Sequence, residues 1–367
     1  MKTFALDILL AALAAAALAL APVQSIAAPK PKDAEKAAEQ SDTNRFVFAS
    51  WNTENLFDPD DDPDNEGDDE YTPEEWTRWT PARYELKLKH IAKVVAEMKP
   101  DAMVFTEIEN FRVMRDLRDA VKAAGWDMPY IIHKDGPDKR GIDNAMLSRH
   151  KPESVEWLSP TPFQRLVLIA RFDVGGRKIT LCGNHWKSYY GDLEAALATR
   201  TIEAHAVREE VEKRLAAEPS AALICTGDFN DSYDAPILVD EAGFSTNLAA
   251  VVAGEPGHVL YNLASGRNKK EVRTYYYARK NRWDSFDTMS VSPGMLEGAK
   301  APAPWKVAVD PENGRFRYEV FRLPEMCNAD NGAPIPFRRI TRKTGVEVLS
   351  GYSDHFPIRV ELEASAP

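Results

Sequence analysis

The chain has 367 residues, of which 44% are hydrophobic and 28% charged, and its formal net charge is −11. This length allows one large domain or two smaller ones with a sizeable core. The negative charge excludes nucleic-acid binding by overall electrostatic attraction, so a polyanionic substrate would need a local basic patch or bound cations.

Residues 1–27 have the pattern of a secretory signal peptide, with a short basic start, an apolar run over residues 4–21 and small residues before an expected cleavage after Ala27. Because the run is short and alanine-rich, we expect an exported protein, periplasmic or secreted, with no stable membrane anchor. Residues 28–44 predict a disordered leader, and a folded domain is expected over residues 45–363.

Strand and helix signals alternate along the first two thirds of the chain. Apolar runs predict strands over residues 45–51 and 102–107. Apolar side chains at helical spacing predict helices over residues 81–98 and 114–124, and His90 is expected on the exposed side of the first of these.

Further strands are predicted over residues 130–133, 145–148, 165–172, 178–182 and 221–226. Asp192 is expected to cap a long helix that ends at Leu215, with Leu193 and Leu197 among its inward residues. Residues 293–336 are rich in proline and glycine and predict long loops with one hairpin. The alternation indicates one mixed α/β domain whose sheet faces are covered by helices.

The segment from Asp58 to Glu70 is strongly acidic. Its Asp62-x-Asp64-x-Glu66-Gly67 run resembles the start of a calcium loop, but Pro73 stands where such a loop needs a bidentate glutamate. A solvated acidic loop is therefore preferred, with weak cation binding as the alternative.

Three cysteines are an odd number for an exported protein. Cys182 and Cys225 lie inside predicted core strands and are expected to be buried free thiols. A disulfide between them would require their strands to be neighbours. Cys327 lies in the loop-rich region.

Polar side chains stand at the expected ends of several strand-like runs. They are Asn52, Glu107, His185, Asp228, Asn230, Asp287, Asp354 and His355. Hard oxygen donors dominate, which suits Mg²⁺, Mn²⁺ or Ca²⁺ rather than zinc, and no Ser or Cys nucleophile stands beside a base. A hard cation together with imidazoles that have carboxylate partners fits the hydrolysis of a phosphate ester.

These residues lie in motifs that together resemble the endonuclease/exonuclease/phosphatase superfamily of deoxyribonuclease-like metal phosphoesterases, closest to its bacterial exported branch. Each motif alone is weak, but the set, in the family's order, is specific. The motifs are Trp51–Asp58, Pro100–Asn110, Arg140–Asp143, Asn184–Ser188, Gly227–Asp231, Trp283–Asp287 and Gly351–His355.

The resemblance implies a four-layer α/β sandwich, with two packed mixed β-sheets flanked by helices. It also implies a Mg²⁺ site (or Mn²⁺ or Ca²⁺) with Glu107 as the principal ligand, helped by Asn52 and Asp354. Glu109 is a rival ligand if the strand register shifts by two residues.

Catalytic roles follow from the same resemblance. Asp228 and Asn230 are expected to hold the attacking water or the phosphate. His355 is expected to act as the general base or to bind phosphate, oriented by Asp287. His185 is expected to bind a phosphate oxygen or to assist the leaving group. Which group removes the proton from water stays open.

Substrate contacts are expected from Arg140, Asn184 and Lys187, the last of which stands where many relatives have proline. Basic residues at 279–282 and 338–343 would grip a nucleic-acid backbone if they surround the metal. The leading hypothesis is therefore an exported endonuclease that hydrolyses nucleic-acid phosphodiester bonds. The alternatives are a phosphatase or sphingomyelinase-like hydrolase of small phosphoesters, or a non-catalytic binding module. No protein partner is inferred.

Overall fold

The computed structural model describes residues 26–27, 44–63, 65–337, 339–342, 345–348 and 350–365. The expected signal peptide and leader therefore lie almost entirely outside the described residues. Within these ranges, none of the helices has the length and apolar character needed to cross a membrane.

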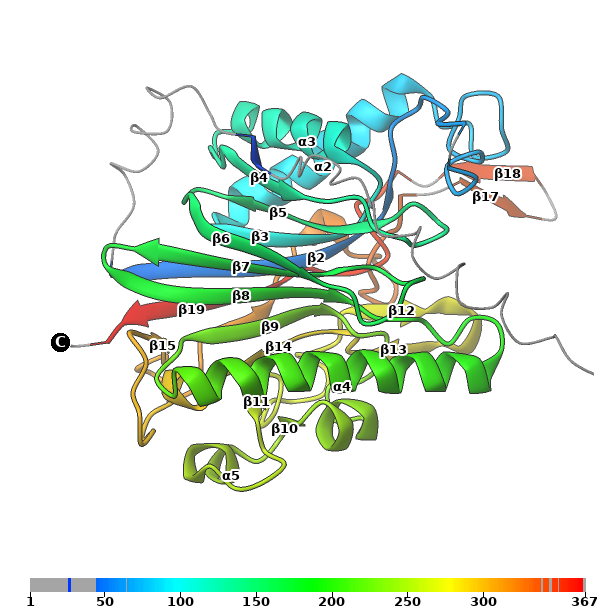
Figure 1. The fold of residues 1–367 in the computed structure, drawn as a ribbon. Coiled ribbons are helices and arrows are strands. Elements are labelled where there is room, and N and C mark those ends of the chain that lie inside the picture. Colours follow the sequence, from blue (N-terminus) through cyan, green and yellow to red (C-terminus); the bar gives the residue numbers. More distant parts are fainter. Residues whose placement is uncertain are drawn as a thin grey trace, which may run out of the picture.

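Two mixed β-sheets pack face to face, and helices cover their outer faces, which confirms the expected four-layer sandwich (Figure 1). In spatial order the first sheet contains β1 (Ile26–Ala27), β4 (Tyr130–His133), β5 (Asp143–Ser148), β3 (Ala102–Ile108), β2 (Arg45–Leu56), β19 (Ile358–Ala364) and β15 (Trp305–Val307), and β16 (Tyr318–Val320) also pairs with β19. The second contains β10 (Phe244–Ser245), β11 (Leu260–Asn262), β14 (Asp287–Val291), β9 (Leu223–Asp228), β8 (Arg177–His185), β7 (Val167–Val174) and β6 (Pro152–Leu158).

Helices α2 (Pro81–Met98) and α3 (Phe111–Ala123) cover the first sheet, and α4 (Leu193–Ala217) and α5 (Leu248–Ala253) lie on the side of the second (Figure 1). Two hairpins stand apart from the main sheets. They are β12 (Tyr275–Tyr277) with β13 (Arg282–Asp284), and β17 (Arg339–Arg342) with β18 (Gly345–Val348).

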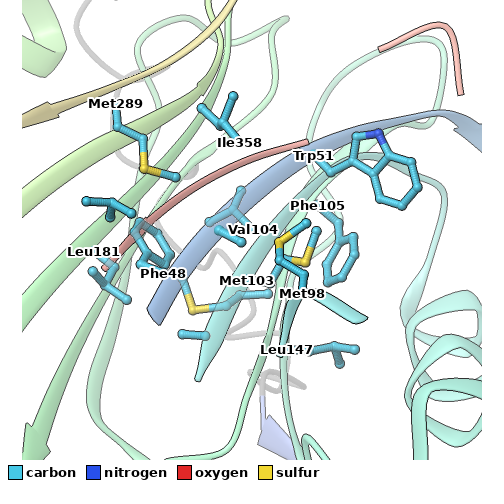
Figure 2. Close-up of a cluster of buried hydrophobic side chains, with 14 of the residues drawn as sticks. Phe48, Trp51, Met98, Met103, Val104, Phe105, Leu147, Leu181, Met289 and Ile358 are labelled. Atoms are coloured by element: carbon cyan, nitrogen blue, oxygen red, sulfur yellow. The ribbon is translucent and has the colours of Figure 1, made fainter. Parts of the chain in front are cut away.

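The core lies between the two sheets and beneath the helices. Phe48, Val104, Leu181 and Met289 are fully buried in the layer between the sheets (Figure 2). Close packing there requires a glycine, since a Cβ at Gly183 would lie 2.9 Å from a methyl carbon of Val104. The apolar side chains of α2 pack against the outer face of the first sheet. The helix begins after Thr80, whose side chain caps it.

The strand order brings the polar strand ends to one edge of the sandwich. Strands β2 and β3 run parallel at the centre of the first sheet, and β8 and β9 run parallel at the centre of the second. The two pairs face each other across the core. Their carboxyl ends, which carry Asn52, Glu107, His185 and Asp228, therefore meet at the same place.

Two polar segments were expected at the ends of strands, but in the structure they lie at the beginnings of strands. Asp287 is the first residue of β14 and pairs with Asp228, and His355 comes before β19. Because β14 and β19 are antiparallel to β9 and β2, the beginnings of these strands lie at the edge where β9 and β2 end. The residues still converge, but the direction of their strands was predicted wrongly.

Helix α4 buries a different face from the one expected. Leu193 and Leu197 are 58% and 44% exposed, so the prediction that they face inward is wrong. The buried face of this half of the helix carries Arg200 and Glu203, which bind the backbone of the loops after β8 and β9. Apolar spacing cannot identify such a face, because its contacts are polar.

Two smaller expectations have clear outcomes. His90 is half-buried rather than exposed, since its ring stacks on Tyr352 at 4.7 Å and Nδ1 lies 2.6 Å from the Gly351 carbonyl. Cys182 and Cys225 pair across neighbouring strands but are buried free thiols, as expected.

Candidate active site

A cleft of about 400 Å³ opens where the polar strand ends meet. Most of the residues that sequence patterns single out line this cleft. They are Asn52, Glu107, Arg140, His185, Asp228, Asn230, Asp354 and His355. Asp287 lies behind His355. The structure brings together segments that are about 300 residues apart in sequence, since the Ser353 hydroxyl donates to the Asn52 carbonyl.

Asp228 occupies the centre of the cleft floor. Its Oδ2 atom accepts a hydrogen bond from the Asn52 amide at 2.9 Å and lies 3.7 Å from Nε2 of His185 and 3.8 Å from Nε2 of His355. Burial raises the pKa of Asp228 to about 6, helped by the charge of Asp287 and opposed by His355. A carboxylate with such a pKa can exchange a proton near neutral pH.

His355 forms a buried pair with Asp287. Nδ1 of His355 lies 2.7 Å from Oδ2 of Asp287, which directs Nε2 toward Asp228. Burial alone would lower the pKa of His355, but the charges of Asp287 and Asp228 and the hydrogen bond to Asp287 raise it well above the usual value. The imidazole is therefore held as a cation.

His185 lies on the other side of Asp228 in a different environment. Its Nε2 atom is 3.9 Å from Oε1 of Glu107, and its Nδ1 atom has no hydrogen-bond partner among the described residues. Burial lowers the pKa of His185 well below the usual value, and the nearby Arg165, Arg140 and His355 lower it further. This imidazole is neutral.

Glu107 enters the cleft from an irregular strand end. The pairing of β3 with β5 shifts between Thr106 and Ile108, and Glu107 adopts a left-handed backbone conformation with φ of 63°. Glu54 and Asn55 at the end of β2 are also left-handed. Non-glycine residues rarely adopt this conformation, and its clustering is typical of functional sites.

The carboxylate of Glu107 has one oxygen in use and one directed to the cleft. Oε2 accepts the Asn55 N–H at 2.8 Å, whereas Oε1 has only longer contacts of 3.9 Å, with Arg140 Nη1 and His185 Nε2. Asn52, whose Oδ1 atom also accepts the Glu54 N–H at 2.9 Å, and Asp354 line the same cleft, and oxygen donors of this kind are those that a hard divalent cation prefers. The donor set therefore fits Mg²⁺.

The rival ligand Glu109 does not face the cleft. It is buried, and its carboxylate accepts the Asp58 N–H at 2.6 Å. Burial, reinforced by the charges of Asp58 and Asp68, raises the pKa of Glu109 to about 9. The register shift that would exchange Glu109 for Glu107 is not found.

Two expected substrate contacts lie outside the cleft lining. Asn184 is fully buried, and its amide donates to backbone carbonyls of Cys182 and Thr226, so it holds the strand end and does not line the cleft. The Lys187 ammonium donates to the carbonyls of Ser188 and Tyr190 at 3.1 and 3.0 Å. The polar atoms of both side chains are bound to the protein's own backbone.

Asn230 remains at the cleft in a fixed position. Its N–H donates to Oδ1 of Asp228 at 2.8 Å, and its side-chain amide donates to the Trp186 carbonyl at 3.0 Å. The left-handed backbone of Asn230, with φ of 52°, makes this tight turn after β9. The side-chain oxygen is left to accept a hydrogen bond from a ligand.

Lys87 is a functional candidate that the sequence analysis missed. It is fully buried on α2 and donates to the carbonyls of Glu54 and Asn55, the turn whose N–H binds Glu107. Burial lowers the pKa of Lys87 to about 8, opposed by Glu54, Glu107 and Asp354. A signal was available, since Lys87 stands on the apolar stripe of its helix.

Aromatic and basic side chains form an arm of the cleft beside the carboxylate of Glu54, which accepts the Phe337 N–H at 2.6 Å. Arg83 lies over the rings of Trp79 and Phe337, at 5.6 and 5.3 Å. Tyr71 also lines this arm, and Trp76, 53% exposed, stands at its rim. Aromatic rings and arginine in one arm can hold a flat or sugar-like group attached to a phosphate.

Beside His355, Tyr275 of β12 lines the cleft. Its ring lies 4.8 Å from that of His355 and stacks on Phe286 at 5.0 Å. The hairpin that it begins carries Arg279 and Lys280 in exposed positions. Arg279 and Lys280 lie in the turn of this hairpin, whose first residue, Tyr275, lines the cleft.

Comparisons with known proteins identify the family and agree with the fold. The model of the Endonuclease/Exonuclease/phosphatase family matches residues 47–364. No curated protein matches the sequence.

Several solved structures share the fold. An endonuclease/exonuclease/phosphatase family protein from Bacteroides thetaiotaomicron has a TM-score of 0.53 and 18% identity, covering 88% of this chain and 99% of its own. TDP2 of D. rerio, complexed with a single strand DNA product, has a TM-score of 0.53 and 16% identity, covering 87% and 99%. Beta toxin from Staphylococcus aureus, with bound magnesium ions, has a TM-score of 0.52 and 15% identity, with the same coverage.

Proposed function

Because this chain belongs to the Endonuclease/Exonuclease/phosphatase family, we propose that it is a metal-dependent phosphodiesterase that cleaves nucleic acid. The observation that carries the proposal is the convergence of Glu107, Asp228 and His355 on one cleft from three distant segments. The likeness to a DNA-bound TDP2 and to a magnesium-bound beta toxin supports the two parts of the proposal.

The ion site would be formed by Glu107, Asn52 and Asp354. When bound, Mg²⁺ would offset the negative charge of the phosphate and of the clustered carboxylates. The Asn55 N–H and the buried Lys87 fix Glu107 and its turn before any ion arrives. A preformed ligand arrangement lowers the cost of binding the ion.

The protein groups divide the proton chemistry between them. Asp228, with a pKa of about 6, accepts a hydrogen bond from the attacking water and takes its proton. His355, held as a cation by Asp287, donates a hydrogen bond from Nε2 to a phosphoryl oxygen as negative charge develops there. Arg140, beside Glu107, supplies a second cation to the phosphate.

A nucleic-acid substrate is favoured by the cations around the cleft. Arg83 and Arg140 line it despite the net charge of −11. The hairpin β12–β13 carries exposed Arg279 and Lys280 in its turn, and it begins at Tyr275, whose ring could support a base. Such a hairpin can contact phosphates adjacent to the one that is cleaved.

A second candidate, a phosphatase acting on a sugar phosphate, is favoured by the aromatic arm. Trp76 and Trp79 stand there with the carboxylates of Glu54 and Glu70, and Trp76 donates to Glu70 at 2.8 Å. Aromatic faces beside carboxylates suit a polyhydroxylated ring. A mannosyl-6-phosphatase of Bacteroides thetaiotaomicron shares the fold at 19% identity and a TM-score of 0.51, covering 86% of this chain and 99% of its own.

A substrate panel with matched variants tests the proposal. Plasmid DNA, single-stranded DNA, RNA, a hexose 6-phosphate and sphingomyelin would each be incubated with Mg²⁺ or with chelator. The test variants are His355→Ala and Glu107→Gln. The controls are His205→Ala and Glu241→Gln, which remove an exposed pair on the outer side of the molecule.

Cleavage of nucleic acid that chelator and both test variants abolish, and that both controls retain, is the expected result. Turnover of the hexose phosphate alone would replace the nuclease by the phosphatase. Turnover of sphingomyelin alone would contradict both. A folded protein that hydrolyses none of these substrates with Mg²⁺ or Mn²⁺ would contradict the proposed enzyme and favour a binding module.

A further inference from the structure

Arg165 is a buried arginine of the cleft whose side chain joins two loops. It stands just before β7, is only 6% exposed and lines the cleft. Its Nε and Nη2 atoms donate to the carbonyls of His185 and Trp186 at 3.1 and 2.8 Å, and Nη1 donates to Oδ2 of Asp138 at 2.7 Å. One guanidinium group thus connects the loop after β8 with the loop between β4 and β5.

The loop after β8 depends on side-chain donors because its backbone leaves the sheet. Strand β8 ends at His185, and a buried carbonyl beyond a strand end needs a donor other than the neighbouring strand. A second buried arginine, Arg200 of α4, donates from Nη1 to the Lys187 carbonyl at 2.7 Å. Guanidinium groups therefore bind the carbonyls of three consecutive residues, 185–187, and hold this loop with charged donors.

Asp138 carries the link from Arg165 to Arg140. Its side chain is 7% exposed, and its two oxygens have different partners. Oδ2 accepts from Arg165, whereas Oδ1 accepts the N–H of Arg140 at 2.9 Å. The Asp138 carbonyl also accepts the Gly141 N–H at 3.0 Å, which closes the turn that carries Arg140. Arg140 and His185 face the cleft from different sheets, and the Arg165–Asp138 pair connects them.

We propose that Arg165 and Asp138 are positioning residues that act as a pair and set the places of His185 and Arg140 for catalysis. The inference rests on the proposed phosphoesterase function. An ion pair buried this deeply loses hydration, and here the further hydrogen bonds of both partners offset that loss. The planar fork of an arginine reaches three acceptors in fixed directions, which a lysine ammonium cannot do.

A double-mutant cycle tests whether Asp138 acts through Arg140. Asp138→Asn keeps a side-chain oxygen for the Arg140 N–H but offers Arg165 an amide donor, so it breaks the link between the loops. It is combined with Arg140→Lys and measured on whichever substrate the panel identifies. The matched control is Glu218→Gln, which removes the partner of Arg171 farther along β7.

Asp138→Asn should raise KM about tenfold with little change in kcat, the cost of one charge-assisted hydrogen bond. Adding Arg140→Lys should raise KM little further, because both changes affect the same contact with substrate. Arg165→Lys should also lower kcat about 10- to 100-fold, because it releases the loop of His185 as well. KM effects that multiply in the double variant, or a Glu218→Gln control as impaired as Asp138→Asn, would overturn the proposal.

Amide hydrogen exchange separates this inference from the proposed function, because it needs no turnover. In Asp138→Asn the amides of residues 139–141 should exchange about tenfold faster than in the wild type, and in Arg165→Lys those of residues 186–187 should do so as well. The amides of α2 should be unchanged in both. A protein inactive on every substrate would contradict the proposed function, and exchange alone would then decide whether the pair holds the two loops. Unchanged exchange at residues 139–141 in Asp138→Asn would overturn the inference, even if Arg165→Lys does not fold.

Discussion

The two sides of Asp228 carry histidines at nearly equal distances but with opposite properties. Nε2 of His185 lies 3.7 Å and Nε2 of His355 lies 3.8 Å from the same carboxylate oxygen, and the side chains are 3% and 6% exposed. The pKa of His185 is lowered by burial, whereas the pKa of His355 is raised by its carboxylate neighbours in spite of burial.

The difference arises behind the imidazoles rather than in the cleft. Asp287 stands 2.7 Å behind Nδ1 of His355, whereas Nδ1 of His185 has no hydrogen-bond partner in the described residues. Burial penalises a charged imidazole in both places, and only the side with a buried counter-charge overcomes the penalty. The sequence motif around a histidine therefore does not define the role of that histidine. The role depends on the group that faces Nδ1, the nitrogen directed away from the cleft.

Removing the Asp228 carboxylate, which lies between the two histidines, should cause the largest loss of activity. In Asp228→Asn the water loses its proton acceptor, and both imidazoles lose their common neighbour. We expect kcat/KM to fall by about 10³- to 10⁴-fold on whichever substrate the panel identifies. The exposed Asp119→Asn on α3 is the control and should retain full activity. A loss below tenfold in Asp228→Asn would contradict its role.

Removing the counter-charge should make the two sides alike. In Asp287→Asn the pKa of His355 should fall, because burial lowers this pKa and the charge of Asp287, which raises it, would be gone. Ring NMR signals should show a protonated His355 at pH 7.5 in the wild type and a neutral one in the variant. The rate should fall about 10- to 100-fold, as for other residues that orient a site group. A protonated His355 in the variant would contradict this explanation.

The same pair sets the sign of one pH effect on stability. The folded-state pKa of His355 lies above the ordinary value of 6.5. Its contribution to stability is therefore complete below about pH 6.5 and is lost as the pH rises through the raised folded value. Asp287→Asn should remove this contribution, so the difference in Tm between wild type and variant should shrink at high pH. A difference that grows with pH would contradict the assignment.

Buried Lys87 supports the metal side of the cleft, and the substitution Lys87→Met removes this support. We expect the Mg²⁺ concentration for half-maximal activity to rise about tenfold, because Lys87 holds the turn whose N–H binds Glu107. Lys89→Met, at an exposed position of the same helix, is the matched control. An unchanged Mg²⁺ dependence in a folded Lys87→Met protein would show that Lys87 serves packing alone.

The smallest effect is expected from Arg140→Lys. A lysine keeps the charge beside Glu107 but loses the fork that also reaches Asn55. KM should rise about tenfold, the cost of one charge-assisted hydrogen bond, with little change in kcat. A fall in kcat with KM unchanged would place Arg140 at the transition state instead.

Much of the fold could be predicted from local sequence, because periodicity and capping are local properties. Helix α2 has the predicted bounds, 81–98, and β4 has the predicted bounds, 130–133. The early strand β2 was predicted too short, since its irregular end at Glu54 and Asn55 follows from pairing with β3. Pairing of distant strands is not visible in a single sequence.

Sequence patterns could predict most residues that line the candidate site, but not the residues that hold them in place. Motif residues such as Glu107 and His355 meet in the cleft as expected. Asn184 and Lys187 do not line it, because their polar atoms bind the local backbone. The role of Lys87 depends on two carbonyls more than 30 residues away, so only the folded chain shows it.

The central claim, that these segments form one metal-dependent phosphoesterase site, is tested most directly by anomalous diffraction from crystals containing Mn²⁺. We predict a strong anomalous peak in the cleft at coordination distance from the Glu107 carboxylate, and its loss in Glu107→Gln. A peak held instead by the cluster of His133 and Asp143, or a peak in the cleft that persists in Glu107→Gln, would contradict the account.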